Sequence, residues 1–444
     1  MRFVMGCFLA VLGLVHSAHA GTFLWGVANA SFQVEGSPAD SDWRRWTHTL
    51  GRIGDGTDAE RATDFLHRYD EDFAWAQILG LNSFRISLAW ERIEPREGIF
   101  DPGAIEIYRR MIRAMRARGL EPVVTLQHFT LPGWLADQGG LLSPRLPRLF
   151  AEYARYAVSE LSDSPAGVKI WLTTNEPMVM ILGGYAGGGF PPGHNNILEA
   201  ERAAGNLAVA HLEAVRAIRA LGRTDLQVSL AHHWLAVAPR NPRNWGDRFY
   251  SHQADEVFNH QFIDAVMTGV IRFGVAPFIR IQKRVPLPAG KPGLDFLDLN
   301  YYRRALIRSQ LLPPFFTYVA GPGPQNDLGW ETYPQGLADA LTTAYGRWHL
   351  PILITENGIA DATDAQRPQY LASHLEALLQ AKVAGVPVLG YVHWSLTDNF
   401  EWAQGEKARF GLMEIDYSTG ERKPRASFLE YGRLIQRLNP AFSR

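Results

Sequence analysis

The chain has 444 residues, of which 46% are apolar, 20% charged and 11% aromatic, and its formal net charge is −1. This composition is typical of a globular protein, argues against a disordered chain and offers no bulk basic charge for nucleic acid. The single cysteine, Cys7, lies within the first twenty residues. If these residues are removed, the processed chain has no disulfide, no thiolate nucleophile and no cysteine-bound metal.

The first twenty residues are typical of an export signal. Arg2 is their only charge, an apolar stretch runs from Phe3 to Val15, and Ala18-His19-Ala20 matches the small-x-small cleavage pattern. The stretch is too short for a stable membrane anchor. We therefore expect a signal peptide over residues 1–20, cleavage after Ala20, and a periplasmic or secreted protein. Lipidation at Cys7 is the alternative for the same segment.

From Gly21 onward, short β-rich runs alternate with longer amphipathic stretches. The eight candidate strands are Thr22–Ala28, Ser83–Leu88, Pro122–Gln127, Val168–Thr173, Leu226–Ala231, Leu294–Asn300, Pro351–Thr355 and Pro387–His393. No linker or low-complexity segment divides the chain, so the pattern predicts a single α/β domain over residues 21–444, a (β/α)8 TIM barrel. A doubly wound open sheet is the alternative, but its usual Gly-rich first turn is missing.

Between the candidate strands, Asp64–Leu79, Ala203–Leu221 and Gln369–Val383 have apolar residues at helical spacing. Leu311–Gln325 is rich in proline and glycine, which predicts a loop. The pair His232-His233 follows a strand without the His-Glu-x-x-His spacing of a metal site, so we interpret it as part of a hydrogen-bonded pocket wall.

In a (β/α)8 barrel the active site forms at the carboxyl ends of the strands. Each candidate strand is followed there by residues that could bind or react, namely Gln33, Glu35, Arg85, Trp90, His128, Asn175, Glu176, His232, His233, Asn300, Tyr301, Tyr302, Glu356, Asn357 and Trp394. Glu176 and Glu356 are the two carboxylates placed directly at strand ends. Two facing carboxylates suit glycoside hydrolysis, because one protonates the departing oxygen while the other attacks the anomeric carbon or activates water. Amides and imidazoles can bind sugar hydroxyls, and indoles can stack on the sugar ring.

Seven segments in order along the chain resemble the motifs of family 1 glycoside hydrolases. They are Phe23-Leu24-Trp25-Gly26-Val27-Ala28 with Gln33-Val34-Glu35-Gly36, Phe84-Arg85-Ile86-Ser87, Thr174-Asn175-Glu176-Pro177, Leu299-Asn300-Tyr301-Tyr302, Ile354-Thr355-Glu356-Asn357-Gly358, His393 through Trp402, and Arg409-Phe410-Gly411-Leu412. They occur in family order between about residues 22 and 417, so the resemblance extends over almost all of the chain after the export signal.

The resemblance implies a role for each matching residue. Glu176 would be the acid/base and Glu356 the nucleophile of a retaining double displacement. Arg85, Tyr302 and Asn300 would support catalysis, while the sugar would be bound by Gln33, His128, Asn175, Trp394, Glu401 and Trp402. A cation beside Glu356 favours its ionised form, whereas Glu176 at the end of an apolar strand is expected to hold its proton longer.

The sequence departs from the commoner family pattern at Phe32, Phe129 and Glu406. Phe129 follows His128 where an indole is usual, and the run His-Phe-Thr-Leu-Pro is similar to an archaeal-like branch that accepts both glucosides and galactosides. None of these changes removes a proposed catalytic group.

We therefore expect a retaining exo-β-glycosidase for terminal β-D-glucosyl residues, with β-galactosyl and β-fucosyl residues left open. Its substrate would be a small β-glycoside or oligosaccharide, and the chemistry needs no metal and no cofactor. Glu401 would exclude sugars with a 6-phosphate. A transglycosidase with the same nucleophile is the alternative. A non-catalytic sugar-binding relative would be expected to lack one of the two glutamates, and this chain has both.

Overall fold

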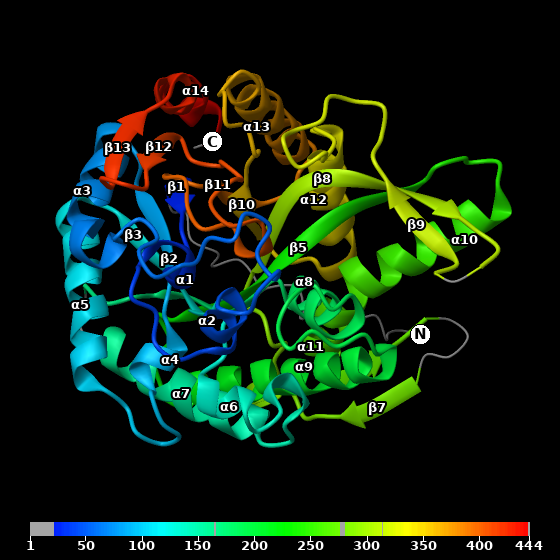
Figure 1. Cartoon of the computed structure of the whole chain (residues 1–444), viewed down its shortest axis with the longest axis horizontal. Helices are drawn as coiled ribbons and strands as arrows, with labels where there is room; N and C mark the ends of the chain where they lie inside the picture. The colour runs from blue at the N-terminus through cyan, green and yellow to red at the C-terminus, as the bar shows by residue number, and fades with distance from the viewer. Residues whose placement is uncertain (1–21, 164–165, 276–279, 313, 443–444) are drawn as a thin grey trace, which may run out of the picture.

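The computed structural model describes residues 22–163, 166–275, 280–312 and 314–442. The expected signal peptide over residues 1–20 lies outside the described residues. Eight parallel strands close into a barrel, because β10 pairs with β8 on one side and with β11 on the other (Figure 1). The barrel strands are β1 (Leu24–Ala28), β2 (Ser83–Ser87), β3 (Glu121–Gln127), β4 (Ile170–Asn175), β5 (Gln227–Pro239), β8 (Leu297–Ser309), β10 (Ile352–Asn357) and β11 (Val388–Trp394). All eight predicted strands are confirmed, and so is the (β/α)8 fold.

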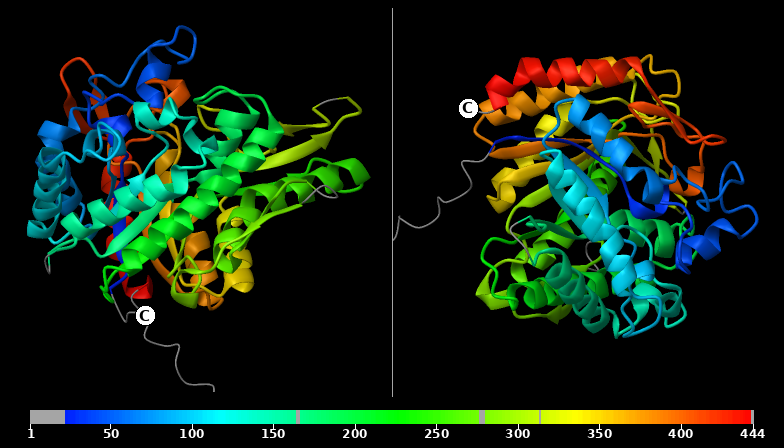
Figure 2. Two further views of the ribbon diagram at one scale, coloured as in Figure 1. Left: turned by 90° about the horizontal axis from the view of Figure 1, so that it is seen from below. Right: turned by 90° about the vertical axis from the view of Figure 1, so that its left-hand side faces the viewer.

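Helices surround the barrel on its outer face (Figure 2). The longer ones are α3 (Phe65–Ile78), α5 (Pro102–Ala117), α7 (Leu146–Leu161), α9 (Ile197–Arg219), α10 (Trp245–Asp255), α11 (Gln261–Thr268), α12 (Gln335–Trp348), α13 (Arg367–Val383) and α14 (Ala426–Phe442). The short ones are α1 (Ser31–Val34), α2 (Asp42–Thr47), α4 (Trp90–Ile93), α6 (Gly133–Ala136) and α8 (Pro177–Ile181). Single turns of 3-10 or π type are η1 (Gly140–Leu142), η2 (Leu182–Ala186), η3 (Glu256–His260), η4 (Pro288–Gly290) and η5 (Trp402–Gln404). The three predicted helices correspond to α3, α9 and α13.

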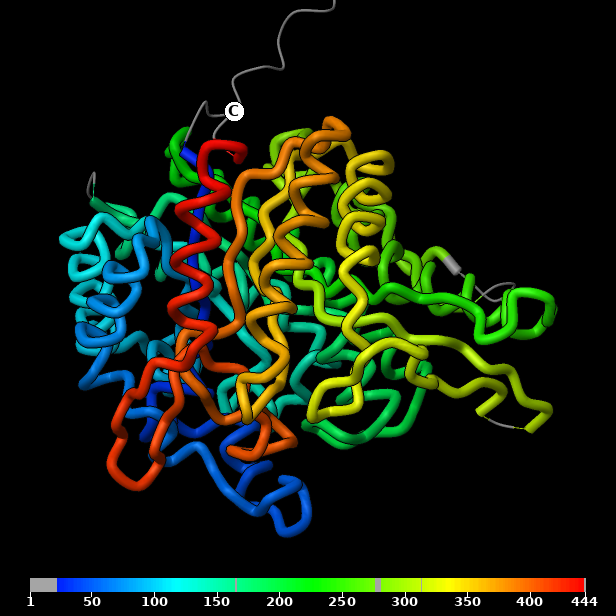
Figure 3. The backbone as a smooth tube through the Cα atoms, turned by 90° about the horizontal axis from the view of Figure 1, so that it is seen from above, coloured from blue at the N-terminus to red at the C-terminus, as the bar shows by residue number. Residues whose placement is uncertain are grey.

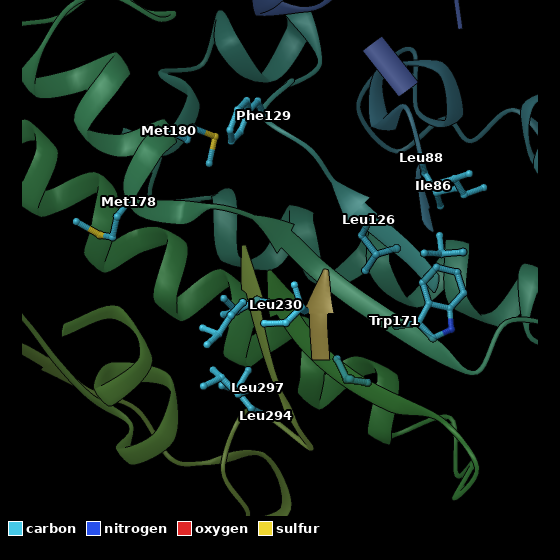
Figure 4. Packing of buried hydrophobic residues seen from close by; sticks show 14 of the residues in the cluster. Ile86, Leu88, Leu126, Phe129, Trp171, Met178, Met180, Leu230, Leu294 and Leu297 are labelled. Atoms are coloured by element: carbon cyan, nitrogen blue, oxygen red, sulfur yellow. The ribbon is translucent and has the colours of Figure 1, made fainter. Parts of the chain in front are cut away.

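Two layers of apolar side chains hold the barrel together. Between strands and helices lies the main core, to which Leu126, Trp171 and Leu230 belong (Figure 4). Inside the barrel, a smaller cluster fills the end remote from the strand carboxyl ends, with Val123, Leu172, Ala231, Phe296 and Leu353 all buried. Because this cluster closes the barrel interior below, a cavity can open only at the carboxyl ends of the strands.

β5 and β8 continue beyond the barrel and form an arm that projects from it (Figures 1 and 3). The arm includes β9 (Phe316–Val319), which pairs antiparallel with the end of β8. The prediction of a loop over Leu311–Gln325 is therefore wrong for these four residues, since backbone pairing with β8 outweighs the surrounding prolines and glycines. The remaining strands make two small hairpins, β6 (Val270–Phe273) with β7 (Arg280–Arg284) and β12 (Met413–Asp416) with β13 (Glu421–Pro424). Within the described ranges, no helix has the length and apolar character needed to cross a membrane.

Candidate active site

A cavity of about 370 Å³ opens at the carboxyl ends of the barrel strands. Eight of the eleven predicted site residues line it, namely His128, Asn175, Glu176, Tyr302, Glu356, Trp394, Glu401 and Trp402. The other three stand directly behind this lining: Arg85 contacts Glu356, Asn300 contacts Glu176, and Gln33 contacts Glu401. The structure thus brings every predicted site residue to one place.

Glu356, at the end of β10, is buried between a cation and a phenol. Arg85 on β2 forms an ion pair with Glu356 Oε1, and the Tyr302 hydroxyl donates a hydrogen bond to Oε2 at 2.6 Å. Arg85 is itself fixed, because its other nitrogens donate to Asn175 Oδ1 at 2.7 Å and to Thr125 Oγ1 at 3.1 Å. Both carboxylate oxygens are therefore held in place by groups that favour negative charge.

Glu176 follows β4 and precedes the proline that begins α8. Its Oε1 accepts a hydrogen bond from Asn300 Nδ2 at 2.9 Å and lies 3.0 Å from His233 Nδ1. The Asn300 amide is oriented by Thr355, whose hydroxyl donates to Asn300 Oδ1 at 2.8 Å. Asn175 Oδ1 accepts from both Arg85 and Asn300, so one chain of hydrogen bonds connects the two carboxyl groups.

The charges of the two carboxyl groups influence each other. Burial raises the pKa of Glu356 to about 7, and the charge of Glu176 adds to this rise against the opposing effects of Arg85 and Tyr302. Burial also acts to raise the pKa of Glu176, but His233 and Asn300 outweigh it, so the pKa of Glu176 is lowered. These directions are the reverse of the sequence expectation, in which Glu356 is ionised and Glu176 keeps its proton. Burial dominates at Glu356, whereas at Glu176 the contacts with His233 and Asn300 favour the carboxylate.

One end of the cavity is lined by His128, Trp394, Glu401 and Trp402, with Gln33 directly behind Glu401. Gln33 Nε2 donates a hydrogen bond to Glu401 Oε2 at 3.2 Å. The His128 ring stacks on both indoles, with its ring centre 6.0 Å from that of Trp394 and 5.8 Å from that of Trp402. Among the described residues, Gln33 Oε1 and His128 Nδ1 are buried without a hydrogen-bond partner. Unpaired polar atoms beside indole rings suit sugar hydroxyls and the C–H face of a pyranose.

The pKa of Glu401, which also lines the cavity, is shifted from its ordinary value. Burial raises its pKa to about 8, and the charges of Glu356 and Glu176 add to the rise. This rise follows from the cavity, in which Glu401 shares a buried space with two other carboxyl groups.

The segment between Trp394 and Phe410 is anchored by Asp398. This buried carboxylate forms ion pairs with Arg425 at 2.8 Å and Arg409 at 3.2 Å, and it accepts the backbone N–H of Gly411 at 3.0 Å. Because Glu401 and Trp402 lie in the same segment, this network positions the sugar-binding end of the cavity.

Five strand-end residues that could bind or react face away from the cavity. Glu35 accepts from Tyr108, Trp90 donates to Glu94, and Tyr301 donates to the carbonyl of Tyr333. The side chain of Asn357 bonds to Tyr370 and to the backbone of Tyr301. His232 contacts the carbonyl of Asn259 at 2.9 Å and lies behind the wall, so only His233 of that pair lines the cavity.

Apart from His233, which was expected in a pocket wall, the outer part of the cavity was not identified residue by residue from the sequence. It is lined by His233 and Leu235 on β5, Phe258 in η3, Arg303 on β8, Tyr318 on β9 and Trp330. These residues come from segments that meet only in the folded barrel. Over the described part of the chain, no group of three or more His, Cys, Asp or Glu side chains is placed to hold a metal ion.

A (β/α)8 barrel whose mouth holds two carboxyl groups among amides, imidazoles and indoles has the architecture of a glycoside hydrolase. The family described as Glycosyl hydrolase family 1 matches residues 15–439. The chain belongs to this family, and it is a β-glucosidase-type glycoside hydrolase with a small-molecule sugar as its substrate.

Relatives of known name agree with this assignment. The chain is 32% identical to "Beta-glucosidase A" of Thermotoga maritima over 93% of this chain and 97% of the relative. It is 31% identical to the "Beta-galactosidase" of Pyrococcus woesei over 91% of this chain and 94% of the relative. Among solved structures, the β-glucosidase from Thermotoga maritima in complex with glucoimidazole superimposes with a TM-score of 0.86 at 31% identity, covering 93% of this chain and 98% of that one. The β-glycosidase from Pyrococcus horikoshii gives a TM-score of 0.84 at 32% identity, covering 95% and 94%.

Proposed function

We propose that this protein is a retaining exo-β-glycosidase in which Glu356 is the nucleophile and Glu176 is the general acid and base. The observation that carries the proposal is the chain of hydrogen bonds from Glu356 through Arg85, Asn175 and Asn300 to Glu176. It fixes two carboxyl groups on opposite strands of the same cavity, one beside a cation and the other beside an imidazole.

In the first step a Glu356 oxygen attacks the anomeric carbon and the bond to the leaving oxygen breaks. That oxygen takes the proton of Glu176. In the second step Glu176 removes a proton from water, the water oxygen attacks the anomeric carbon, and the bond to Glu356 breaks. Retention requires carboxyl groups about 5–5.5 Å apart, because the nucleophile must reach the carbon directly.

The reactive form has its proton on Glu176 and its charge on Glu356. Arg85 and Tyr302 stabilise the Glu356 carboxylate in that form. His233 Nδ1 lies 3.0 Å from Glu176 Oε1 and, with Asn300, holds the Glu176 side chain in place.

For the sugar, we propose a terminal β-D-glucosyl residue, with β-galactosyl and β-fucosyl residues also accepted. Relatives named β-glucosidase and β-galactosidase are similar to this chain to nearly the same degree, at 32% and 31% identity. Phe129 lines the cavity and packs on Trp402 with ring centres 4.8 Å apart. A phenyl ring at this position has no N–H with which to select a particular hydroxyl configuration.

Two measurements test these proposals. ¹H NMR of a β-glycoside digest identifies the first-formed sugar, and the β-anomer is expected; an initial α-anomer would show inversion. A panel of aryl β-glycosides that differ at C2, C4 and C6 then ranks glucose, galactose and fucose. Strict rejection of the galactoside would contradict the broad sugar specificity.

We also propose that the protein is exported, since Arg2, the apolar stretch and Ala18-His19-Ala20 form an export signal. N-terminal sequencing of the protein recovered from periplasm or medium is expected to begin at Gly21. A chain that retains Met1 in the cytoplasm would contradict this.

A further inference from the structure

The outer part of the cavity contains one positive side chain that no acidic group neutralises. Among the described residues, Arg303 is the only lysine or arginine that lines the cavity. Its guanidinium lies over the Trp330 ring at 5.0 Å from the ring centre. No hydrogen bond or ion pair joins this guanidinium to any described side chain, although most other arginines of the chain have acidic partners.

A local irregularity of the barrel explains why Arg303 faces the cavity. The register between β5 and β8 shifts, so that Trp234 pairs with Tyr301 and Ala236 pairs with Arg304. Tyr302 and Arg303 are therefore opposite the single residue Leu235, as in a β-bulge. Bulges redirect side chains, and here Tyr302, Arg303 and Leu235 all line the cavity.

Arg303 lies on the leaving-group side of the reacting centre. Burial lowers its pKa, and among the described groups Tyr318 is the other influence on it; none of Glu176, Glu356 and Glu401 contributes. Tyr318 belongs to the projecting arm and is 46% exposed, which places this pair toward the mouth of the cavity. The sugar-binding residues Gln33, His128 and Glu401 lie at the other end.

The half-buried guanidinium remains charged, because arginine does not lose its proton in proteins. A partly desolvated cation without a counter-charge is unfavourable, and an anion with two adjacent oxygens, such as a carboxylate or a sulfonate, would satisfy two of its N–H groups at once. Trp330, Phe258 and Leu235 provide flat or apolar surface in the same part of the cavity.

We propose that Arg303 forms an anion-binding subsite for the leaving group, so that the preferred substrates carry a carboxylate or sulfonate on a flat, apolar aglycone. The inference rests on the proposed function, since that function places the aglycone on this side. An acidic group on the sugar itself would instead meet Glu401 and its neighbouring carboxyl groups, and would be disfavoured.

The test compares 4-carboxyphenyl β-D-glucoside with its neutral counterpart, 4-carbamoylphenyl β-D-glucoside, and adds 4-sulfophenyl β-D-glucoside to distinguish the two anions. The ratio of kcat/KM between acid and amide is measured for the wild type, Arg303→Gln, Arg303→Lys and Arg308→Gln. Arg308 is the matched control, because it lies on the same strand and is exposed. Comparison between variants cancels the intrinsic reactivity of the two leaving groups.

We expect Arg303→Gln to lower the acid-to-amide ratio about tenfold or more, as for loss of a charged hydrogen bond. Arg303→Lys should lower this ratio less than Arg303→Gln does, and Arg308→Gln should leave it at the wild-type value. An unchanged acid-to-amide ratio in Arg303→Gln would overturn the anion-binding subsite. It would not contradict the proposed glycosidase function.

Binding of the corresponding 1-thio-β-D-glucosides, measured by calorimetry, separates the two proposals and needs no turnover. Wild-type protein should bind the acid more tightly than the amide. Equal affinity would overturn the anion subsite, whether or not the variants fold. Failure to cleave any of the aryl glucosides would overturn the proposed function instead.

Discussion

The His233 imidazole lies 3.0 Å from Glu176 Oε1, and this contact lowers the pKa of Glu176 while that of Glu356 is raised. A carboxyl group beside an imidazole and a carboxyl group beside a guanidinium thus share one cavity. The protonation of the pair is set jointly by burial, by Arg85 and His233, and by the charge of each carboxylate on the other.

Replacing His233 tests its effect on the acid. His233→Asn removes the positive charge that lowers the pKa of Glu176, so this pKa should rise. Because Glu176 must be protonated to act as acid, the alkaline limb of kcat/KM should move to higher pH. His252→Asn, an exposed histidine on α10, is the matched control. An alkaline limb that stays in place would show that His233 does not tune Glu176.

Replacing Tyr302 tests how the pKa of the nucleophile, Glu356, is set. Tyr302 donates a hydrogen bond that lowers the pKa of Glu356, so Tyr302→Phe should raise it above about 7. Because Glu356 must be ionised to attack, the acidic limb of kcat/KM should move to higher pH, in addition to any loss of rate. A pH series with an activated aryl glucoside measures this limb, and a shift to lower pH would contradict the assignment.

Regular patterns allowed most of the fold to be predicted. Apolar runs located all eight barrel strands, and ordered motifs located both carboxyl groups. The extension of β5 and β8 into the arm could not be predicted, because backbone pairing with β9 stabilises it and no side-chain periodicity marks it. Glu35 and Tyr301 were candidates from their positions after strands, but side-chain direction depends on the barrel geometry.

The pKa directions of Glu176 and Glu356 and the lining of the outer cavity could not be predicted from the sequence for a related reason. Burial raises the pKa of Glu356, and the pKa of Glu176 is lowered by contacts that include His233, which is 57 positions away along the chain. Arg303 faces the cavity because of a bulge, which depends on how two strands pair. Such effects come from residues that meet only after folding, so a sequence motif does not record them.

Glu401 should discriminate against phosphorylated sugars. Three carboxyl groups line the cavity, and a phosphate of roughly −1.5 to −2 charge near Glu401 would be repelled even if one or two carboxyls are protonated. The wild type should therefore reject 6-phosphoglucosides. Glu401→Ser should weaken binding of the plain glucoside by about 1.5–3 kcal/mol, if one charged hydrogen bond is lost, and should partly relax the exclusion. Comparable turnover of the 6-phosphoglucoside and its parent by the wild type would refute this role.

Asp398 should contribute to stability rather than to chemistry. It is fully buried between Arg425 and Arg409, and Asp398→Ala leaves these cations without their partner. Loss of one partner of a buried pair costs about 3–5 kcal/mol in the free energy of unfolding. Urea denaturation measures this cost. Glu430→Gln removes an exposed pair with Arg433 and should cost less than about 1 kcal/mol. Similar losses in both variants would contradict the anchoring role of Asp398.

The identity of the nucleophile is tested most directly by trapping the covalent intermediate. An activated 2-deoxy-2-fluoro-β-D-glucoside slows both steps through its fluorine, while its good leaving group keeps the first step fast enough for the glycosyl-enzyme to accumulate. Peptide mass spectrometry then identifies the labelled residue. We expect one 2-deoxy-2-fluoroglucosyl label per chain on Glu356, and no label in Glu356→Gln. A label on Glu176 or Glu401, or turnover without any covalent intermediate, would contradict it.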